Sequence, residues 1–209
     1  MRLGLLADIH SYLAETRRAL ELFKERGVDR VVTLGDTIHC QGRREEAREV
    51  AQLLLDVDAV GVWGNHDYDL RPDAQQRAQT DFAPVVLEFM AKMQPRVVLG
   101  DCHFSHKEAS IDAHVKDQIW DVHDSHLTLP ERAALSFAAA PQRWHFIGHH
   151  HQWWAATPTT QPVWEGAGPL TFQTGERYFI SLGAGREGWC AIMDTDLAHF
   201  EPLWCGIPK

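Results

Sequence analysis

A chain of 209 residues, with 44% hydrophobic and 23% charged residues, is long enough for one α/β domain with a sizeable core and short for two. The net charge of −9 disfavours nonspecific binding to nucleic acid or to an anionic membrane. No apolar run approaches the length of a membrane span, and Met1 leads into an apolar strand pattern without the segments of a signal peptide. We therefore expect a single cytoplasmic domain over residues 1–209.

Histidine is unusually frequent, whereas cysteine shows no pattern. The 13 histidines exceed what packing requires and indicate metal binding in a chain that is not cationic. The cysteines have neither CxxC spacing nor a disulfide framework, so we expect reduced thiols at Cys40, Cys102, Cys190 and Cys205.

The first third of the chain alternates apolar runs with amphipathic segments. We expect strands at 2–7, 30–34 and 59–63, and helices from Ser11, as the capping residue, to Gly27 and at 43–56. This β-α-β-α-β order predicts parallel strands joined by right-handed crossovers.

Later segments alternate less regularly. In chain order, we expect a loop or ragged helix start at 69–80, a helix at 81–93, a hairpin of strands 96–99 and 102–105, a surface excursion near the site at 107–130, a helix at 130–140 and a strand at 144–147. Beyond these, antiparallel strands are expected at 178–181, 189–193 and 198–200. The C-terminal third of the single α/β domain therefore adds strands to a second sheet.

Five of the apolar runs share one feature, which is that they end in polar side chains. Packing of the core does not explain polar side chains at these positions, because burial of a polar group without a partner costs free energy. In an open α/β sheet, the carboxyl ends of the strands are where ligands bind. The groups that follow the five runs are Asp8 and His10, Asp36, Asn65 with His66 and Asp67, His106, and His149 with His151.

Seven of these side chains could bind metal, namely Asp8, His10, Asp36, Asn65, His106, His149 and His151. Carboxylates, imidazoles and an amide oxygen, without a thiolate, favour Mn²⁺, Fe or Zn²⁺ over a structural zinc. One ion takes about four to six ligands, so seven suit two metals that share a bridging carboxylate, an arrangement used on phosphate esters.

The same residues resemble, in order, the five motif blocks of the calcineurin-like metallophosphoesterases, over roughly residues 1–151: Asp8-x-His10, Gly35-Asp36, Gly64-Asn65-His66-Asp67, His106 and Gly148-His149-x-His151. The spacing is most similar to that of the small bacterial and archaeal phosphodiesterases of the family. The resemblance implies an α/β fold, a four-layer αββα sandwich of two mixed β-sheets flanked by helices.

The resemblance also implies roles for the individual residues. Asp8, His10, Asp36 and His151 would hold a first metal, and Asp36 would bridge to a second, which is completed by Asn65, His106 and His149, with manganese favoured for both. A hydroxide between the metals would attack phosphorus in line. His66 would not be a ligand but would neutralise developing charge and protonate the leaving oxygen.

Three departures from the family pattern matter. The protein phosphatases of the family carry a second Asp and an Arg after Gly35-Asp36, where this chain has His39 and Cys40. This weighs against a protein phosphatase and leaves open what orients His66, for which Asp67 is a candidate. In addition, Lys107 replaces the usual Gly after His106, and residues 181–184 replace the Asn-Pro-Gly-Ser block found in many members.

Several other residues could also contribute to the site, but for most of them we favour a structural interpretation. His103 competes with His106 but lies in mid-strand, and alternation turns His150 away from its neighbours. His39 is equally compatible with a substrate contact and a solvated loop. A solvated helix start is favoured over phosphate contact for Arg43 and Arg44, and core packing or an oligomer interface over base stacking for Trp153, Trp154 and Trp164.

We therefore expect a metal-dependent phosphoric ester hydrolase, most simply a phosphodiesterase acting on a small phosphoester. The absence of a basic stripe argues against a nucleic acid polymer as substrate. A phosphomonoesterase or a nucleotide pyrophosphohydrolase is an alternative within the same class, and a non-catalytic scaffold with this fold is an alternative of another class. The natural substrate, the metal and the oligomeric state are left open.

Overall fold

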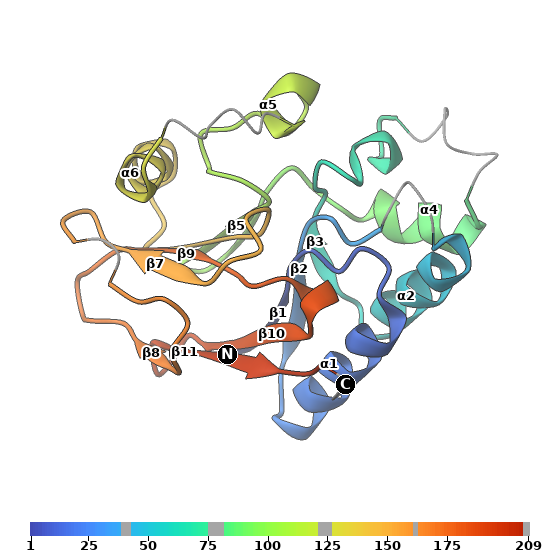
Figure 1. Ribbon diagram of the computed structural model, residues 1–209, viewed down its shortest axis with the longest axis horizontal. Coiled ribbons are helices and arrows are strands. Elements are labelled where there is room, and N and C mark those ends of the chain that lie inside the picture. Colours follow the sequence, from blue (N-terminus) through green and yellow to red (C-terminus); the bar gives the residue numbers. More distant parts are fainter. Residues whose placement is uncertain (39–42, 75–81, 121–126, 161–162, 207–209) are drawn as a thin grey trace.

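Two mixed β-sheets packed face to face, with helices outside them, make up the computed structural model (Figure 1). It describes residues 1–38, 43–74, 82–120, 127–160 and 163–206. His39 and Cys40 therefore lie outside the described residues. None of the helices within these ranges combines the length and the apolar character that crossing a bilayer requires.

The larger sheet has the strand order β3-β2-β1-β10-β11-β8. Its parallel strands are β1 (Arg2–Leu6), β2 (Arg30–Leu34) and β3 (Val60–Val62), and its antiparallel strands are β10 (Trp189–Asp194), β11 (His199–Trp204) and β8 (Leu170–Thr171). Helices α1 (Leu13–Glu25) and α2 (Arg44–Asp56) connect the parallel strands, so the predicted β-α-β-α-β unit is confirmed.

The smaller sheet has the strand order β4-β5-β6-β9-β7. Its central strands β5 (Cys102–Ser105), β6 (Trp144–Ile147) and β9 (Tyr178–Ser181) are parallel, and the edge strands β4 (Val97–Leu99) and β7 (Trp154–Ala156) are antiparallel to their neighbours. The remaining elements are η1 (Tyr68–Leu70), α4 (Pro84–Ala91), α5 (Lys116–Trp120), α6 (Leu129–Ala139) and η3 (Gly185–Glu187).

Alternation along the strands divides the apolar side chains among three cores. Leu3 and Leu5 of β1 share a core with Phe104 and Phe146 of the smaller sheet, which fills the space between the sheets. A second core joins the other face of the larger sheet to α1, α2 and α4, and a third joins the smaller sheet to α6. These layers, visible in Figure 1, confirm the predicted αββα sandwich.

A close approach between β1 and α1 depends on a glycine. A Cβ atom at Gly4 would lie 2.6 Å from Cδ2 of Phe23, closer than carbon atoms can pack. Glycine therefore lets the buried Phe23 ring lie flat on the strand. This contact sets the spacing of α1 from the sheet and hence the course of the loop between β1 and α1.

Some predicted boundaries are wrong for local reasons. Ser11 does not cap α1, because its backbone is left-handed (φ 62°) and its N–H donates to Thr37 O, so Tyr12 takes the N-cap position. The helix expected at 81–93 is observed from Pro84, since the residue before a proline is disfavoured in a helix and Ala83 is extended. The strand expected at 198–200 continues to Trp204.

The tryptophans that follow the last motif block pack in the cores. Trp154 is buried against Phe179, with ring centroids 5.1 Å apart. Trp153 meets the edge of Trp164 at 5.9 Å and that of Trp189 at the same distance. These contacts support the interpretation as core packing over a stacking surface for substrate.

Candidate metal centre

Backbone hydrogen bonds fix the loops that carry the candidate ligands. The loop after β1 pairs with the loop after β2, through Asp8 N–H to Gly35 O at 3.1 Å and His10 N–H to Asp36 O at 2.8 Å. In the smaller sheet, Gly148 N–H donates to His106 O at 3.2 Å. His149 N–H donates to Asp8 Oδ2 at 3.0 Å, so the loops at the carboxyl ends of the two sheets meet.

The ligand loops have an unusual backbone. Five of the seven candidate ligands are non-glycine residues with left-handed φ angles, namely Asp8 (52°), His10 (49°), Asp36 (49°), His149 (68°) and His151 (55°). This conformation is unfavourable for L-residues and concentrates where a function requires it. The strain turns these side chains out of the strand alternation and toward one another.

Two glycines of the motif blocks make room for ligand side chains. A Cβ at Gly64 would lie 2.1 Å from Asp36 Oδ1, and a Cβ at Gly35, whose φ is 86°, would lie 2.5 Å from His106 Nδ1. Any larger residue would displace the ligand beside it. The glycines that precede Asp36 and Asn65 in sequence therefore have a steric reason to be there.

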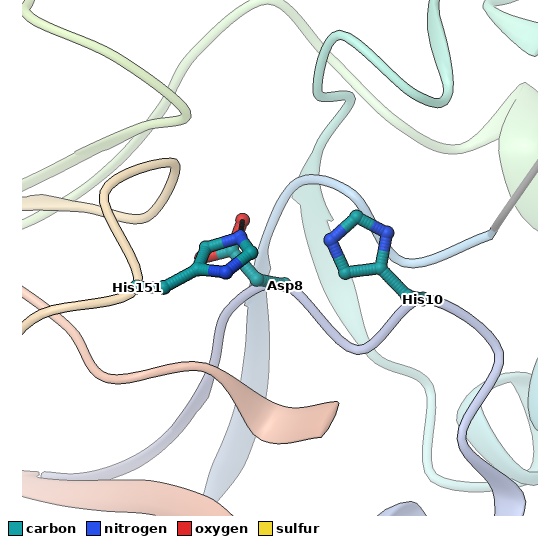
Figure 2. Close-up of side chains that lie close together, drawn as sticks. All are labelled: Asp8, His10 and His151. Atoms are coloured by element: carbon teal, nitrogen blue, oxygen red, sulfur yellow. Dashed lines mark ion pairs between the residues drawn. The ribbon is translucent and has the colours of Figure 1, made fainter. Parts of the chain in front are cut away.

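Asp8, His10 and His151 form the first group of converging side chains. Their potential ligand atoms all lie within 4.8 Å of one another. His151 Nε2 lies 3.4 Å from Asp8 Oδ1, and His10 Nε2 lies 3.8 Å from Asp36 Oδ2. Figure 2 shows the His151 ring beside the Asp8 carboxylate and His10 on the other side of Asp8.

His106 is the centre of the second group and provides a test of whether these residues fit a cation. Its Nδ1 lies 2.8 Å from Leu34 O, a pure acceptor, so a neutral ring donates there and keeps a lone pair on Nε2. That lone pair faces Asn65 Oδ1 at 2.9 Å and Asp36 Oδ1 at 3.5 Å. His149 Nδ1 approaches the same Asn65 oxygen at 3.1 Å. Electron-pair donors that face one another without a proton between them fit a bound cation.

The electrostatics of the carboxylates lead to the same conclusion. Burial, together with the negative charges of Asp8 and Asp67, raises the pKa of Asp36 well above its ordinary value. Burial lowers the pKa of His10 to about 3 and that of His149 to about 2, so both rings are neutral. Neutral imidazoles are metal ligands, and a divalent ion would offset the repulsion between the carboxylates and displace the proton from Asp36.

His66 lies at the mouth of this cluster and is partly exposed. Its backbone N–H donates to Asp36 Oδ1 at 2.8 Å, and its ring meets the edge of His10 with centroids 4.9 Å apart. A ring nitrogen of His66 also lies within 4.8 Å of potential ligand atoms of His10 and Asp36. The His66 ring can therefore reach a group that is bound over the carboxylates on their solvent side.

The Asp67 carboxylate joins loops of the main chain. It accepts hydrogen bonds from the backbone N–H groups of Thr37 (3.0 Å), Ile38 (2.8 Å) and Gly64 (3.1 Å). Burial raises its pKa to about 6, although these three hydrogen bonds act in the opposite direction. Asp67, the candidate for orienting His66, thus ties the loop after β2 to the loop after β3.

The residues that the sequence offered as alternative members of the site contact other groups in the structure. His103 is buried in β5 beside His145, with ring centroids 5.1 Å apart. His150 Nε2 points to Glu108, 3.6 Å from Oε1. The guanidinium of Arg43 lies over the Tyr12 ring and pairs with Glu46 at 2.8 Å. The described cysteines, Cys102, Cys190 and Cys205, are free thiols, as expected from their spacing.

Two residues near the site were missed by the sequence reasoning. Arg186 N–H donates to Asp8 O at 3.1 Å, and its positive charge, after burial and the charge of His66, contributes to the low pKa of His10. Trp120 lies 5.1 Å from His66 between ring centroids. Sequence signals for both exist: Arg186 lies two residues after the block at 181–184, and Trp120 is the only Phe, Trp or Tyr in the excursion at 107–130.

Comparisons with known proteins agree with this geometry. Carboxylates, imidazoles and an amide gathered at the strand ends of a double-sheet sandwich define an α/β protein with a candidate dinuclear metal centre. A family model described as the calcineurin-like phosphoesterase superfamily domain matches residues 1–176, and the chain therefore belongs to this superfamily. The family predicted from the five motif blocks is confirmed.

Three solved structures share the fold. A metallophosphoesterase from Sphaerobacter thermophilus is 22% identical with a TM-score of 0.73, over 100% of this chain and 90% of that one. A hypothetical protein from Pyrococcus horikoshii is 11% identical with a TM-score of 0.64, over 100% and 89%. An archaeal phosphodiesterase is 14% identical with a TM-score of 0.56, over 98% and 99%. At these identities the likeness concerns the fold alone.

One curated relative matches by sequence. An uncharacterized protein from Methanocaldococcus jannaschii is 33% identical over 66 residues, which make up 32% of this chain. The match covers 26% of the length of that relative.

Proposed function

We propose that this protein is a phosphodiesterase that uses two divalent metal ions to hydrolyse a small phosphoester, and that residues 1–209 act as one domain. The observation that carries the proposal is the lone pair of His106 Nε2 facing the oxygens of Asn65 and Asp36. A cation bound between these three groups would satisfy all of them at once. Membership of the phosphoesterase superfamily supports phosphate esters as the substrate class.

The ligands divide into two sets that share one carboxylate. The first ion would be held by Asp8, His10, Asp36 and His151, and the second by Asp36, Asn65, His106 and His149. Among Mn²⁺, Fe and Zn²⁺, we favour Mn²⁺, because oxygen and imidazole donors suit it and thiolates are absent from the set. When bound, such ions lower the pKa of a water and polarise the phosphoryl group.

The other residues of the site would position the substrate and neutralise its negative charge. The His66 ring, anchored by the hydrogen bond from its own N–H to Asp36, is placed to protonate the leaving oxygen and to neutralise charge in the transition state. Arg186 adds positive charge on the same side as His10. Asp67 holds the loops that carry Asp36 and Asn65 at a fixed separation.

The experiment that tests the proposal compares bis-p-nitrophenyl phosphate with p-nitrophenyl phosphate. Metal-stripped protein is assayed with and without added Mn²⁺, as wild type and as His66→Ala, with His199→Ala on β11 as a control histidine away from the ligand loops. We expect Mn²⁺-dependent hydrolysis of the diester, reduced by about 10²- to 10⁴-fold in His66→Ala, and unchanged in the control.

Binding of Mn²⁺ to His66→Ala is measured in parallel by calorimetry, so that loss of metal is separated from loss of catalysis. Preference for the monoester would replace the proposal with a phosphomonoesterase. Turnover of neither ester, with both metals bound, would favour a non-catalytic scaffold.

A further inference from the structure

Trp120 is an exposed aromatic residue beside the candidate catalytic histidine. Its relative exposure is 38%, and its ring centroid lies 5.1 Å from that of His66 at an interplanar angle of 55°. The preceding residue, Ile119, is 1% exposed and belongs to the core around α1, α2 and α4. The chain thus buries Ile119 and keeps Trp120 exposed beside His66, where water contact with an aromatic side chain is unfavourable.

Hydrogen bonds fix this segment to the loop that carries the ligands. Trp63 Nε1 donates to Ala113 O at 3.1 Å, and Tyr68 Oη donates to His114 O at 2.7 Å. Trp63 and Tyr68 flank Asn65 and His66 in sequence, so the segment and the candidate catalytic loop form one unit.

A second tie comes from the smaller sheet. Lys107, which follows His106, donates from Nζ to Gln118 O at 3.1 Å. The Gln118 side chain in turn accepts from Asp112 N–H at 2.9 Å. Helix α5 is therefore held from both sheets although it is only five residues long, and the position of the Trp120 ring relative to His66 is set by these contacts.

We propose that the exposed face of Trp120 stacks on a planar aromatic ring in the leaving group of the substrate and so determines specificity. This inference rests on the proposed function, because it takes His66 as the donor of the proton to the leaving oxygen. In that reaction the bond between phosphorus and the leaving oxygen breaks, and water supplies the oxygen that replaces it. The leaving oxygen must lie within hydrogen-bond reach of His66, so the group attached to it extends beside Trp120.

Two kinds of substrate carry such a ring. In an aryl ester the ring is bonded directly to the leaving oxygen, and in a nucleotide ester the base is attached through the sugar. Both present a flat π-surface to an indole, and stacking of this kind tolerates different rings. The test therefore includes one substrate of each kind.

The kinetic experiment measures kcat/KM with Mn²⁺ for three methyl phosphodiesters, whose leaving groups are phenol, trifluoroethanol and thymidine. The proteins are wild type, Trp120→Leu, Trp120→Phe and Trp204→Leu. Trp204 is a matched control, since it is 54% exposed on β11, which lies at the far end of the molecule from α5 in Figure 1. Intrinsic reactivity cancels when the ratio of aryl to alkyl rates is compared between proteins.

Trp120→Leu is expected to lower the phenyl to trifluoroethyl ratio about tenfold, whereas Trp120→Phe retains most of it and Trp204→Leu all of it. If Trp120→Leu lowers the ratio of thymidine to trifluoroethyl rates by the same factor, the stacking site also accepts nucleotides. If that ratio is unchanged, the site is restricted to aryl esters. If all three substrates slow equally in Trp120→Leu, Trp120 acts on His66 and the inference is wrong.

An equilibrium measurement separates this inference from the proposed function. Phenylphosphonate and methylphosphonate are titrated calorimetrically into the Mn²⁺-loaded wild type and Trp120→Leu proteins. About tenfold tighter binding of phenylphosphonate, lost in Trp120→Leu, supports the stacking surface even if no diester is hydrolysed. If the wild type hydrolyses diesters but binds phenylphosphonate and methylphosphonate equally, the proposed function is retained and the role of Trp120 is refuted.

Discussion

Replacement of Asp67 by alanine removes the carboxylate that joins two ligand loops. Asp67 is fully buried, and its side chain accepts three hydrogen bonds, from the N–H groups of Thr37, Ile38 and Gly64. The alanine variant leaves all three donors without an acceptor. We expect the loops after β2 and β3 to separate and the protein to lose stability.

The magnitude follows from the number of donors left unpaired. An unsatisfied buried donor costs about 1–3 kcal/mol, so three would cost about 3–9 kcal/mol. Water entering the vacated space would satisfy some of them, and we expect a loss of about 3–5 kcal/mol. Asp67→Asn keeps one acceptor oxygen but places an NH₂ group against the donors, so its loss is expected to be about half as large.

Urea unfolding of the metal-free protein at pH 7 measures this loss as a shift of the midpoint at constant slope. Asp69→Ala is the matched control, because Asp69 lies two residues away and is exposed, and its change is expected to stay within about 0.5 kcal/mol. A loss below about 1 kcal/mol in Asp67→Ala would show that the carboxylate does not pin the loops.

Three further predictions concern buried ionisable groups. Burial lowers the pKa of His103 and of His145 to about 4, and since these rings titrate near 6.5 when unfolded, their contribution to stability is complete above about pH 6.5 and lost as the pH falls toward 4. Urea midpoints at pH 7 and pH 4.5 are expected to differ less in the double variant His103→Phe, His145→Leu. Asp36→Asn is expected to raise the thermal midpoint of the metal-free protein, since the pKa of Asp36 is raised by burial and by neighbouring carboxylates. The same variant is expected to lack the stabilisation by Mn²⁺ that we expect in the wild type. Arg132→Met leaves the charge of Glu108 buried and is expected to cost about 2–4 kcal/mol in urea unfolding, most of which Glu108→Gln restores in the double variant.

Sequence reasoning predicted those parts of the fold and site that local patterns determine. Asp36 follows an apolar run and a glycine, so its place at a strand end was predictable, and the five motif blocks identified the family. The partners of Asp67 were not predictable, because two of the three backbone N–H groups it binds lie about thirty residues earlier in the chain and carry no residue-specific signal. Ser11 shows the converse. It is a residue type that favours the N-cap position, but its backbone N–H donates to Thr37 O in the neighbouring loop, and it does not cap the helix.

The positions of Trp120 and Arg186 near the candidate site depend on contacts between segments far apart in sequence. A short helix with one exposed aromatic residue has no periodicity to recognise, and only the hydrogen bonds from Trp63 and Tyr68 bring it to the site. The conformations of the ligand loops were also not predictable, because a left-handed backbone is uncommon even for Asp and His, and at Asp8 and His149 it is imposed by tertiary structure.

The pairing of β1 with β10 has a consequence for how the protein is made. Arg2 is opposite Asp194 in this ladder, and the loop that carries Asp8 receives hydrogen bonds from Gly185 and Arg186. During synthesis, the loop that carries Asp8 leaves the ribosome well before its sheet neighbour β10 exists. Such distant contacts slow folding, so the candidate metal centre can become complete only after β10 has been made.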